Sequence, residues 1–493
     1  MFTIDWQLVT KELMYDPKNP LLFNNGFFVY FFVAFIACYY AVQRSMQWRA
    51  LVLSLFSLYF FYKASGWYVS LVILTALVVY GIGIAIESVE VAWKRKLLLM
   101  FSVFFNLALL FYFKYTNFFI SIINQLNHQS ISPLQLILPI GISFYTFENL
   151  SYTIDIYKKE IKAERNIFHY LLFLSFFPKL VMGPIVRAKD FIPQLKKPFL
   201  VSHNDFYYGA YLICSGLFKK IILSDYISNN LVNYVFENPS LHTGYENLLA
   251  VYGYAIVIYC DFSGYSDVAI GIARWLGVTI PANFKSPYQS TSVTEFWKRW
   301  HISLSSWLQD YLYIFTLGGN RNGVFRTNVN LILTMLIGGF WHGANWTFIV
   351  WGGLHGTALV INKYWNNWTR TRLGNGKAYT ILMGFITFHV VCLCWIFFKS
   401  TDVATALQVI TQITTQRSME GFSLFIANYR IVFVMMALAV LLHAIPDDYM
   451  TTKIQKMNTY RLAAMLTGFF ILLLVLYSYF KSSEPVMPIY LQF

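Results

Sequence analysis

Apolar runs about as long as a lipid bilayer is thick recur along this chain of 493 residues. Phe23–Val42, Trp67–Ile86 and Leu97–Ile123 are three such runs, and about 20 apolar residues cross the hydrocarbon core as a helix. Charged residues make up only 12% of the chain and hydrophobic residues 57%, whereas a soluble chain carries about 25% charged residues. The sequence therefore predicts an all-α integral membrane protein.

Several apolar segments contain residues that a straight lipid-facing helix tolerates poorly. Pro139 and Gly141 interrupt Leu136–Tyr157, Ile167–Met182 ends in FPKLVMGP, and Leu248–Leu276 is interrupted by CDFSGYSD. Irregular backbone at membrane depth is tolerated where it is buried in protein or lines a cavity. We therefore expect roughly eleven spanning segments together with re-entrant or broken helices.

Basic residues gather in short loops beside the apolar runs, at Arg44–Arg49, Lys94–Lys96 and Lys158–Arg165. The positive-inside rule explains such clusters as cytoplasmic loops. The net charge of +14 therefore indicates orientation among membrane lipids rather than binding of nucleic acid. Residues 1–22 form a polar segment without the basic n-region and apolar h-region of a signal peptide. No internal repeat is visible, and we expect one integral membrane domain over residues 1–493.

The five cysteines lie inside or beside apolar stretches. Cys392 and Cys394 are two residues apart and would diverge on a helix, so the pattern indicates neither a disulfide framework nor a zinc site. No nucleophile elbow, zinc-binding HExxH or dinucleotide fingerprint occurs in a supporting context. The sequence thus predicts no metal ligand set.

Histidines, carboxylates and a basic cluster lie between apolar segments in Thr294–Gly356. His342 stands there in GGFWHGANW, among small residues that would let a reacting atom approach closely. A neutral imidazole can accept a proton from a hydroxyl and return it to a leaving group. The alternative is a histidine that only forms hydrogen bonds between helices. His355 in GGLHG is interpreted as structural.

His301 lies in the run EFWKRWHISLSSWLQDYLY. On one continuous helix His301 and Ser305 share a face, whereas Asp310 falls on roughly the opposite face, so spacing does not pair Asp310 with His301. A membrane-surface amphipathic helix is the alternative to a catalytic role. The tryptophans of this run are typical of interfacial anchors: Trp297, Trp300 and Trp307.

Asp261 and Asp267 flank FSGYS inside an apolar span. Intramembrane carboxylates indicate a functional site by default, but the Ser, Tyr and Gly neighbours equally suit hydrogen-bonded packing between helices. The glycine-rich Leu317–Gly323 lacks the Lys-Ser/Thr ending of a phosphate loop and is interpreted as a turn. These patterns indicate a membrane protein with a buried polar site, and they leave an enzyme and a transporter equally open.

Five motifs follow one another between Leu138 and Gly356: LPIGISFYTFENLSYTIDIY, SFFPKLVMGPI, DFSGYSDVAIGIARWLG, SVTEFWKRWHISLSSWLQDYLYIFTLGGNR and GGFWHGANWTFIVWGGLHG. In order and spacing this set closely resembles the membrane-bound O-acyltransferase family, and within it the membrane subunit of bacterial alginate O-acetylation. Residues 138–356 are thereby identified as the family's motif core. One departure is that Phe315 and Thr316 stand before the glycine-rich turn, where the family pattern has a proline.

The resemblance implies a ring of helices around a thin central region and an acyl-transfer reaction. His342 corresponds to the family's invariant histidine and would act as the base, while His301 corresponds to the second family histidine and would orient the donor or stabilise charge. The candidates for supporting roles or for the substrate tunnel are Trp341, Asn345, Asp310, Ser305 and Asp261.

The resemblance also implies a reaction scheme. Acetyl-CoA is the expected co-substrate, with no bound cofactor, and the acetyl group would cross the bacterial inner membrane. A periplasmic, esterase-like SGNH acetyltransferase would then pass it to an exopolysaccharide such as alginate. The alternatives are transfer of D-alanine or another acyl group to a cell-wall polymer, and a lipid or proton-coupled transporter. Proton-coupled carriers often show repeated halves, which this sequence lacks.

Overall fold

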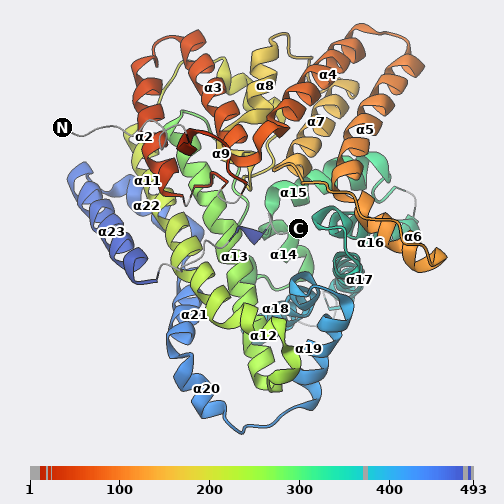
Figure 1. The fold of residues 1–493 in the computed structure, drawn as a ribbon, viewed down its shortest axis with the longest axis vertical. Helices are drawn as coiled ribbons and strands as arrows, with labels where there is room; N and C mark the ends of the chain where they lie inside the picture. The colour runs from red at the N-terminus through yellow and green to blue at the C-terminus, as the bar shows by residue number, and fades with distance from the viewer. Residues whose placement is uncertain are drawn as a thin grey trace. The chain divides into compact units, whose positions relative to one another are not determined.

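The computed structural model of the chain describes residues 11–17, 20–23, 25–321, 323–369, 376–480 and 487–489. Within these residues every regular element is a helix and no strand occurs (Figure 1). The all-α fold predicted from the apolar runs is therefore confirmed. In the polar segment 1–22, residues 1–10, 18 and 19 lie outside the described part of the chain.

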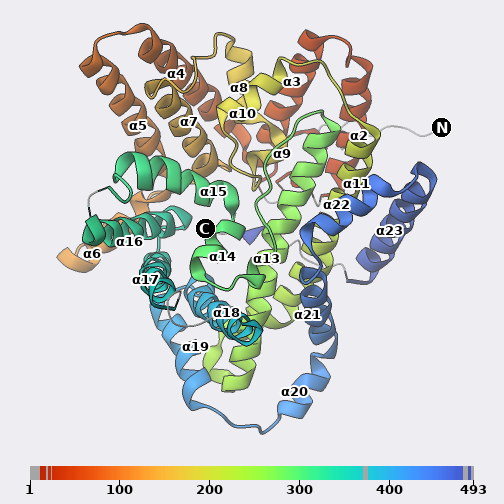
Figure 2. The ribbon, with the colours of Figure 1, turned by 180° about the vertical axis from the view of Figure 1, so that it is seen from behind.

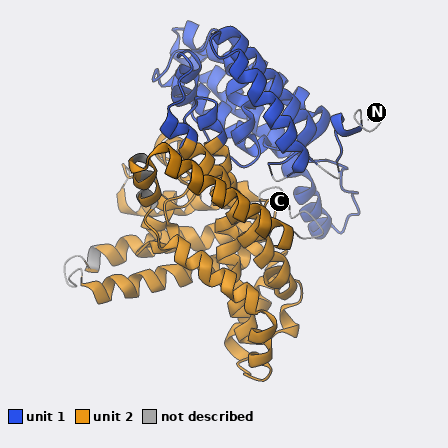
Figure 3. Cartoon of the chain, turned by 90° about the vertical axis from the view of Figure 1, so that its left-hand side faces the viewer, with its two compact units in different colours: residues 1–206, 272–281 blue, residues 207–271, 282–493 orange. Residues whose placement is uncertain are grey.

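The chain divides into two compact units (Figure 3). Unit 1 consists of residues 1–206 and 272–281, and unit 2 consists of residues 207–271 and 282–493. The single integral membrane domain expected from the sequence remains a prediction. Both histidines singled out as catalytic candidates belong to unit 2.

The helices of unit 1 begin where polar residues give way to apolar runs. The Asn25 side chain accepts a hydrogen bond from Phe27 N at 2.9 Å at the start of the first of them, and Ser45 accepts one from Trp48 N at the start of the next. Such caps satisfy N–H groups that have no partner within the helix. The helices are α2 (Gly26–Ala41), α3 (Met46–Ser65), η1 (Gly66–Tyr68), α4 (Val69–Ser88), α5 (Ala92–Lys114), α6 (Thr116–Asn127), α7 (Ile142–Tyr157), α8 (Ile167–Ser175), α9 (Phe177–Leu180) and α10 (Ala188–Leu195).

Helices α4, α5 and α7 pack side by side in unit 1 (Figures 1 and 2). Asn149 Nδ2 donates to Asn106 Oδ1 at 2.9 Å, and the Tyr170 hydroxyl donates to Asn149 Oδ1 at 2.7 Å. Glu148 and Lys179 form a buried ion pair. Because burying polar groups is costly unless they are paired, these contacts explain how α7 can carry polar residues and still lie almost entirely in the interior.

The breaks expected around Pro139 and in FPKLVMGP are present. Residues 131–139 are not helical, and Gly141 precedes α7 with a left-handed φ of 77°. A Cβ atom on Gly141 would meet Leu180 O at 2.6 Å, so only glycine permits this close approach. At Phe176 the backbone leaves the helical region between α8 and α9.

Unit 2 holds the remaining helices, except that α11 (His203–Leu217) starts in unit 1 and α13 (Gly244–Trp275) ends in it. Three of its elements have π-helical geometry, a form that often occurs at functional sites. These three are η2 (Phe218–Asp225), η3 (Ser228–Val232) and η6 (Leu308–Thr316). The other elements are α11 (His203–Leu217), α12 (Asn233–Glu237), η4 (Pro239–Leu241), α13 (Gly244–Trp275), η5 (Pro287–Gln289), α14 (Val293–Arg299), α15 (Ile302–Trp307), α16 (Gly323–His342), α17 (Trp346–Thr369), α18 (Lys377–Lys399), α19 (Val403–Thr415), α20 (Phe422–Asn428), α21 (Arg430–His443), α22 (Asp447–Lys456) and α23 (Thr459–Phe480).

Within the described residues, six helical runs are long and apolar enough to cross a membrane, or up to seven if the bent pair α20 and α21 forms one span. This number is smaller than the roughly eleven expected from the sequence. One reason is that Met46–Ser88 counts as a single run of 43 residues. Another is that several apolar segments form shorter helices, such as α2 with 16 residues and α8 with 9, whereas a full span takes about 20 residues.

The interruption expected within Leu248–Leu276 is absent, because α13 is one continuous helix of 32 residues. Its carboxylates are paired with lysines from η2. Lys220 Nζ lies 2.5 Å from Asp261 Oδ1, and Lys219 forms an ion pair with Asp267. Since these charges are compensated from outside the helix, α13 does not have to unwind to satisfy them.

Candidate active site

His342 is the last residue of α16, and its side chain is buried among aromatic rings. The imidazole centroid lies 5.1 Å from the Trp351 ring and 5.2 Å from the Phe398 ring, both in edge-to-face geometry. Trp341 and Phe348 also contact the imidazole. Aromatic surroundings of this kind exclude water, and polar interactions are stronger in a medium of low polarity.

The position of His342 is set by the close packing of α16 against α17. Gly339 lies one turn before His342. A Cβ atom on Gly339 would collide with Phe348 O and would reach Gly352 Cα at 3.1 Å. Small residues let helix backbones approach closely in membranes, so the glycines of GGFWHG bring the end of α16 directly against α17.

Asn345 holds the short turn between His342 and α17. Its side-chain oxygen accepts a hydrogen bond from Thr347 N at 3.0 Å, which caps α17, and its Nδ2 donates to Thr401 O at 2.7 Å. A helix N-cap of this type satisfies an N–H group in the first turn. The supporting role expected for Asn345 remains a prediction, and its contacts suit a residue that orients the backbone next to His342.

His301 occupies a break between α14 and α15 and has a left-handed φ of 42°. Ile302 N donates to Asn283 O at 2.9 Å, and the Ser303 hydroxyl donates to Asn283 Oδ1 at 2.6 Å. Asn283 thereby accepts hydrogen bonds from a backbone N–H group and a hydroxyl group at the start of α15. One continuous amphipathic helix through this run, the alternative to a catalytic role, is therefore not formed. Ser305 N still donates to His301 O at 2.9 Å, as in a helical turn.

The His301 side chain is fully buried. Its ring lies 4.6 Å from the Phe262 ring in an edge-to-face contact. Burial lowers the pKa of His301 to about 3, because desolvation disfavours the charged imidazolium. His301 is therefore neutral at physiological pH and can serve as a hydrogen-bonding group rather than as a fixed cation.

An aromatic cluster connects the segment of His301 with the surroundings of His342. The Trp300 ring lies 4.9 Å from Trp395, which in turn lies 5.4 Å from Phe398, a neighbour of His342. Trp300 and Trp307 are buried, so the expectation that they act as interfacial anchors is wrong. The sequence suggested anchors because tryptophans beside Lys and Arg also mark membrane interfaces.

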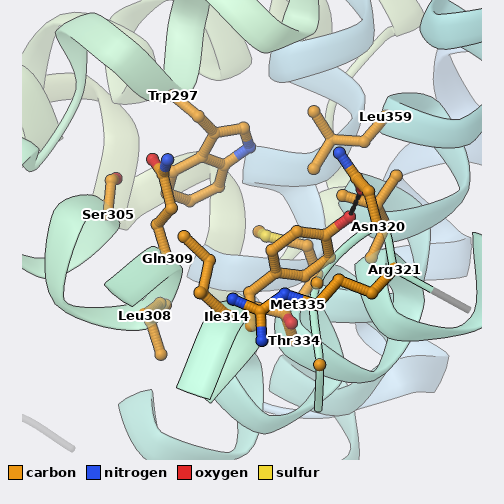
Figure 4. A pocket seen from close by; sticks show the side chains of 14 residues that line it. Trp297, Ser305, Leu308, Gln309, Ile314, Asn320, Arg321, Thr334, Met335 and Leu359 are labelled. Atoms are coloured by element: carbon orange, nitrogen blue, oxygen red, sulfur yellow. Dashed lines mark hydrogen bonds between the residues drawn. The ribbon is translucent and has the colours of Figure 1, made fainter. Parts of the chain in front are cut away.

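A cavity of about 460 Å³ opens between α14, α15, η6, α16 and α17. This volume lies within the range of about 300–1,000 Å³ that is usual for sites of small ligands. Ser305 and Gln309 lie on one side of the cavity, and Asn320 and Arg321 lie on the other (Figure 4). The residues that line it are Trp297, Ser305, Leu308, Gln309, Tyr313, Ile314, Gly318, Gly319, Asn320, Arg321, Leu331, Thr334, Met335 and Leu359.

The interpretation of the glycine-rich segment as a turn is confirmed. Gly318 and Gly319 have positive φ values of 84° and 60°. Asn330 Nδ2 donates to the carbonyl oxygens of Leu317 and Gly319, both at 2.9 Å. This turn forms part of the cavity wall, where the Tyr313 hydroxyl donates to Asn320 Oδ1.

Two tryptophans connect the cavity to His342. Trp297 lines the cavity, and its ring lies 5.7 Å from Trp351, whose ring contacts His342. Trp297 Nε1 donates to His355 Nδ1 at 3.3 Å. His355 is fully buried, and this contact agrees with the structural role expected for it.

The remaining candidates lie in different surroundings. Ser305 lines the cavity, and its hydroxyl donates to Trp300 O at 3.0 Å. Asp310 lies in the π-helix η6 beside that cavity wall. Asp261 is not among the residues that line the cavity, and it pairs with Lys220. The catalytic or supporting roles of these residues remain predictions.

Neither Trp351 nor Asn283 is among the residues expected from the sequence to belong to the site. Trp351 stands nine residues after His342 in the same motif, and this proximity was the only available signal for it. Asn283 gave no signal, because it lies outside the quoted motifs and acts through the backbone at His301. The sequence pattern of Trp297 indicates an interfacial anchor, whereas in the structure its side chain lines the cavity.

Within the described residues, no group of three or more His, Cys, Asp or Glu side chains is arranged to hold a metal ion. The five cysteines are free thiols, of which Cys38 is exposed and the others are buried.

Comparison with known proteins agrees with this arrangement. Residues 157–400 match the membrane-bound O-acyltransferase family. The chain is 38% identical over 401 residues to a probable alginate O-acetylase of Pseudomonas putida, with 79% of each chain covered. It is 34% identical over 421 residues to a peptidoglycan O-acetyltransferase of Helicobacter pylori, again with 79% of each chain covered.

A more distant relative transfers a different group. The chain is 29% identical over 272 residues to a teichoic acid D-alanyltransferase of Bacillus subtilis, which covers 53% of this chain and 68% of that protein. The region that matches the family, residues 157–400, contains His301, His342 and all the residues that line the cavity. The chain is thus a multi-pass membrane O-acyltransferase, and it belongs to the membrane-bound O-acyltransferase family.

Proposed function

We propose that this enzyme takes an acetyl group from acetyl-CoA on the cytoplasmic side of the bacterial inner membrane and delivers it for O-acetylation of an exopolysaccharide of the alginate type. Two of the three relatives named above carry O-acetylation in their names, and the alginate-type relative is 38% identical over 79% of the chain. The observation that carries the proposal is the buried His342, which Trp297 and Trp351 connect to a cavity of ligand size.

The chemistry proposed for His342 follows from what acyl transfer requires. A hydroxyl becomes a good nucleophile when a base removes its proton as it attacks the thioester carbonyl, and the same group can then protonate the leaving thiolate. A neutral imidazole can perform both steps. His301, which is neutral and buried, would orient the donor by hydrogen bonding.

The cavity is the proposed site for the arm of the thioester donor. Its lining is largely apolar, with polar side chains such as Gln309, Asn320 and Arg321 among them. Arg321 is exposed, and a guanidinium group is well suited to a phosphate because it offers several donors in a fixed plane. An acetylated pantetheine arm would occupy the apolar part, with a phosphate of the donor at Arg321.

Transfer of D-alanine is the second candidate, because one relative is a teichoic acid D-alanyltransferase. A D-alanyl group carries an ammonium ion, which needs a carboxylate or another acceptor when it leaves water. None of the described residues that line the cavity is Asp or Glu, and one of them is Arg321. This electrostatic pattern favours the uncharged acetyl group.

The acceptor is proposed to be the hydroxyl of a periplasmic, esterase-like SGNH acetyltransferase, which passes the acetyl group to the polymer. In this scheme the polymer is modified outside the cytoplasm, whereas acetyl-CoA is supplied from the cytoplasm. A membrane enzyme with a reaction centre between the two compartments links these two pools. The polymer itself is then the final acceptor and does not have to enter the membrane.

Inverted membrane vesicles from cells that express the enzyme and the esterase-like partner would test the donor. Radiolabelled acetyl-CoA added outside such vesicles meets the original cytoplasmic face, and label on the partner or polymer inside would support the proposal. A carrier protein loaded with radiolabelled D-alanine serves as the competing donor. Label from D-alanine but not from acetyl-CoA would overturn the acetyl assignment in favour of the second candidate.

A further inference from the structure

Trp351 carries a buried hydrogen-bond donor next to His342. The side chain is 1% exposed, and its ring lies 5.1 Å from the His342 imidazole at an interplanar angle of 86°. No acceptor among the described residues lies within hydrogen-bonding distance of Trp351 Nε1. Leaving a buried donor without a partner costs free energy, so a donor kept in this state requires an explanation.

Neighbouring groups do not supply this acceptor. Trp297, the adjacent indole on the cavity side, already donates its N–H to His355 Nδ1 at 3.3 Å. That bond fixes the proton of the neutral His355 ring on Nε2, so His355 offers no free lone pair to Trp351, although the two rings are only 4.8 Å apart. Phe398, at 5.4 Å from Trp351, has no polar atom in its side chain.

We infer that Trp351 is a further catalytic residue, whose indole N–H donates a hydrogen bond to the carbonyl oxygen of the acyl group during transfer at His342. This inference rests on the proposed function. Acyl transfer places negative charge on that oxygen, and a fixed donor in a site that excludes water stabilises the charge strongly. Trp351 contacts both Trp297 of the cavity wall and His342, so its indole lies between the proposed donor site and the proposed base.

The hydroxyl oxygen of the acceptor forms a bond to the carbonyl carbon of the acetyl thioester while His342 takes the hydroxyl proton. The electron pair of the C=O bond moves onto the oxygen, which accepts the hydrogen bond from Trp351 Nε1. When the carbonyl reforms, the C–S bond breaks and the thiolate takes the proton back from His342. The products are an acetate ester and a free thiol, and no redox partner is needed.

The test replaces Trp351 by Phe, which keeps an aromatic ring against His342 and removes the N–H. In inverted vesicles supplied with acetyl-CoA, we expect kcat for acetyl transfer to fall about 10²- to 10³-fold, the usual effect of removing one oxyanion donor, with KM for acetyl-CoA unchanged. Trp395→Phe is the matched control, because Trp395 is buried in the same aromatic cluster and this change removes a second indole N–H that has no acceptor within hydrogen-bonding distance among the described residues. That control should keep wild-type kcat.

Two outcomes would overturn the inference. Wild-type kcat in Trp351→Phe would show that the N–H takes no part, and a raised KM with unchanged kcat would show that the ring only shapes the binding site. If Trp351→Phe does not fold, benzothienylalanine at position 351 replaces the indole N–H by sulfur while keeping the bicyclic shape, and its kcat decides the question. His342→Ala is assayed in parallel: if it retains wild-type transfer, the proposed function fails, whereas its inactivity beside an active Trp351→Phe rejects only the donor role.

Discussion

Asp261 holds two donors in the interior of unit 2. Lys220 Nζ lies 2.5 Å from its Oδ1, and Ile489 N donates to its Oδ2 at 3.0 Å. Asp261 is 1% exposed, and the Lys220 side chain is 5% exposed. These contacts connect α13, η2 and a segment near the end of the chain, so Asp261 contributes to stability whatever its part in the reaction.

Replacing Asp261 by Ala should destabilise the protein by about 3 kcal/mol, the lower end of the cost of breaking a buried ion pair. The lower end applies because Asp225 still lies 2.7 Å from Lys220. Thermal unfolding in detergent would measure the change. Asp267→Asn is the control, since its pair with Lys219 is partly exposed and is therefore worth less. An Asp261→Ala protein with wild-type stability would contradict this account.

The burial of His301 predicts a dependence of stability on pH. Its pKa in the folded protein is about 3, below the ordinary value of 6.5, so between these values the unfolded chain binds a proton that the folded protein does not. Stability from this residue is therefore present above pH 6.5 and lost as the pH falls toward 3. The unfolding temperature should drop between about pH 7 and pH 5, and it should drop less in His301→Gln. Equal losses in both proteins would reject this assignment.

At the scale of elements, the hairpin of α16 and α17 places the proposed base. Gly339→Ala should weaken this packing, because the added methyl group meets backbone atoms of Phe348 and Gly352 that cannot move aside. Overpacking of this kind costs about 1–3 kcal/mol, and the shift of His342 should also reduce acetyl transfer. Gly353→Ala is the matched control on the facing helix, where the new Cβ would meet only Leu336 Cδ2 at 3.6 Å. Measured unfolding temperatures and transfer rates that are equal in the two variants would contradict the role of Gly339.

The elements differ in how far the sequence could predict them. The breaks near Gly141 were predictable, because proline and glycine act on the local backbone. The continuity of α13 was not, because Asp261 is neutralised by Lys220, which lies 41 residues away in the sequence. The break at His301 was equally hidden, since its cause is Asn283 on a separate segment. Hydrophobic periodicity reflects only local sequence preferences. The continuity of α13 and the break at His301 instead depend on contacts between residues that are distant in the sequence.

At the scale of the whole molecule, the all-α membrane fold and the acyltransferase family followed from apolar runs and from the order of the motifs. The number of spans did not, because a hydropathy window cannot distinguish a helix of 9 or 16 residues within an apolar segment from a full span. The sequence also indicated His342 and His301. The cavity, with walls from α14, α15, η6, α16 and α17, required the packed structure.

The enzyme is proposed to transfer an acetyl group with His342 as the base. The most direct measurement is the acetate content of the exopolysaccharide from cells that carry His342→Ala at the wild-type level of folded membrane protein. We expect acetate on the polymer to be lost, because without the imidazole no base activates the acceptor hydroxyl. Undiminished acetate on the polymer in that strain would contradict this expectation.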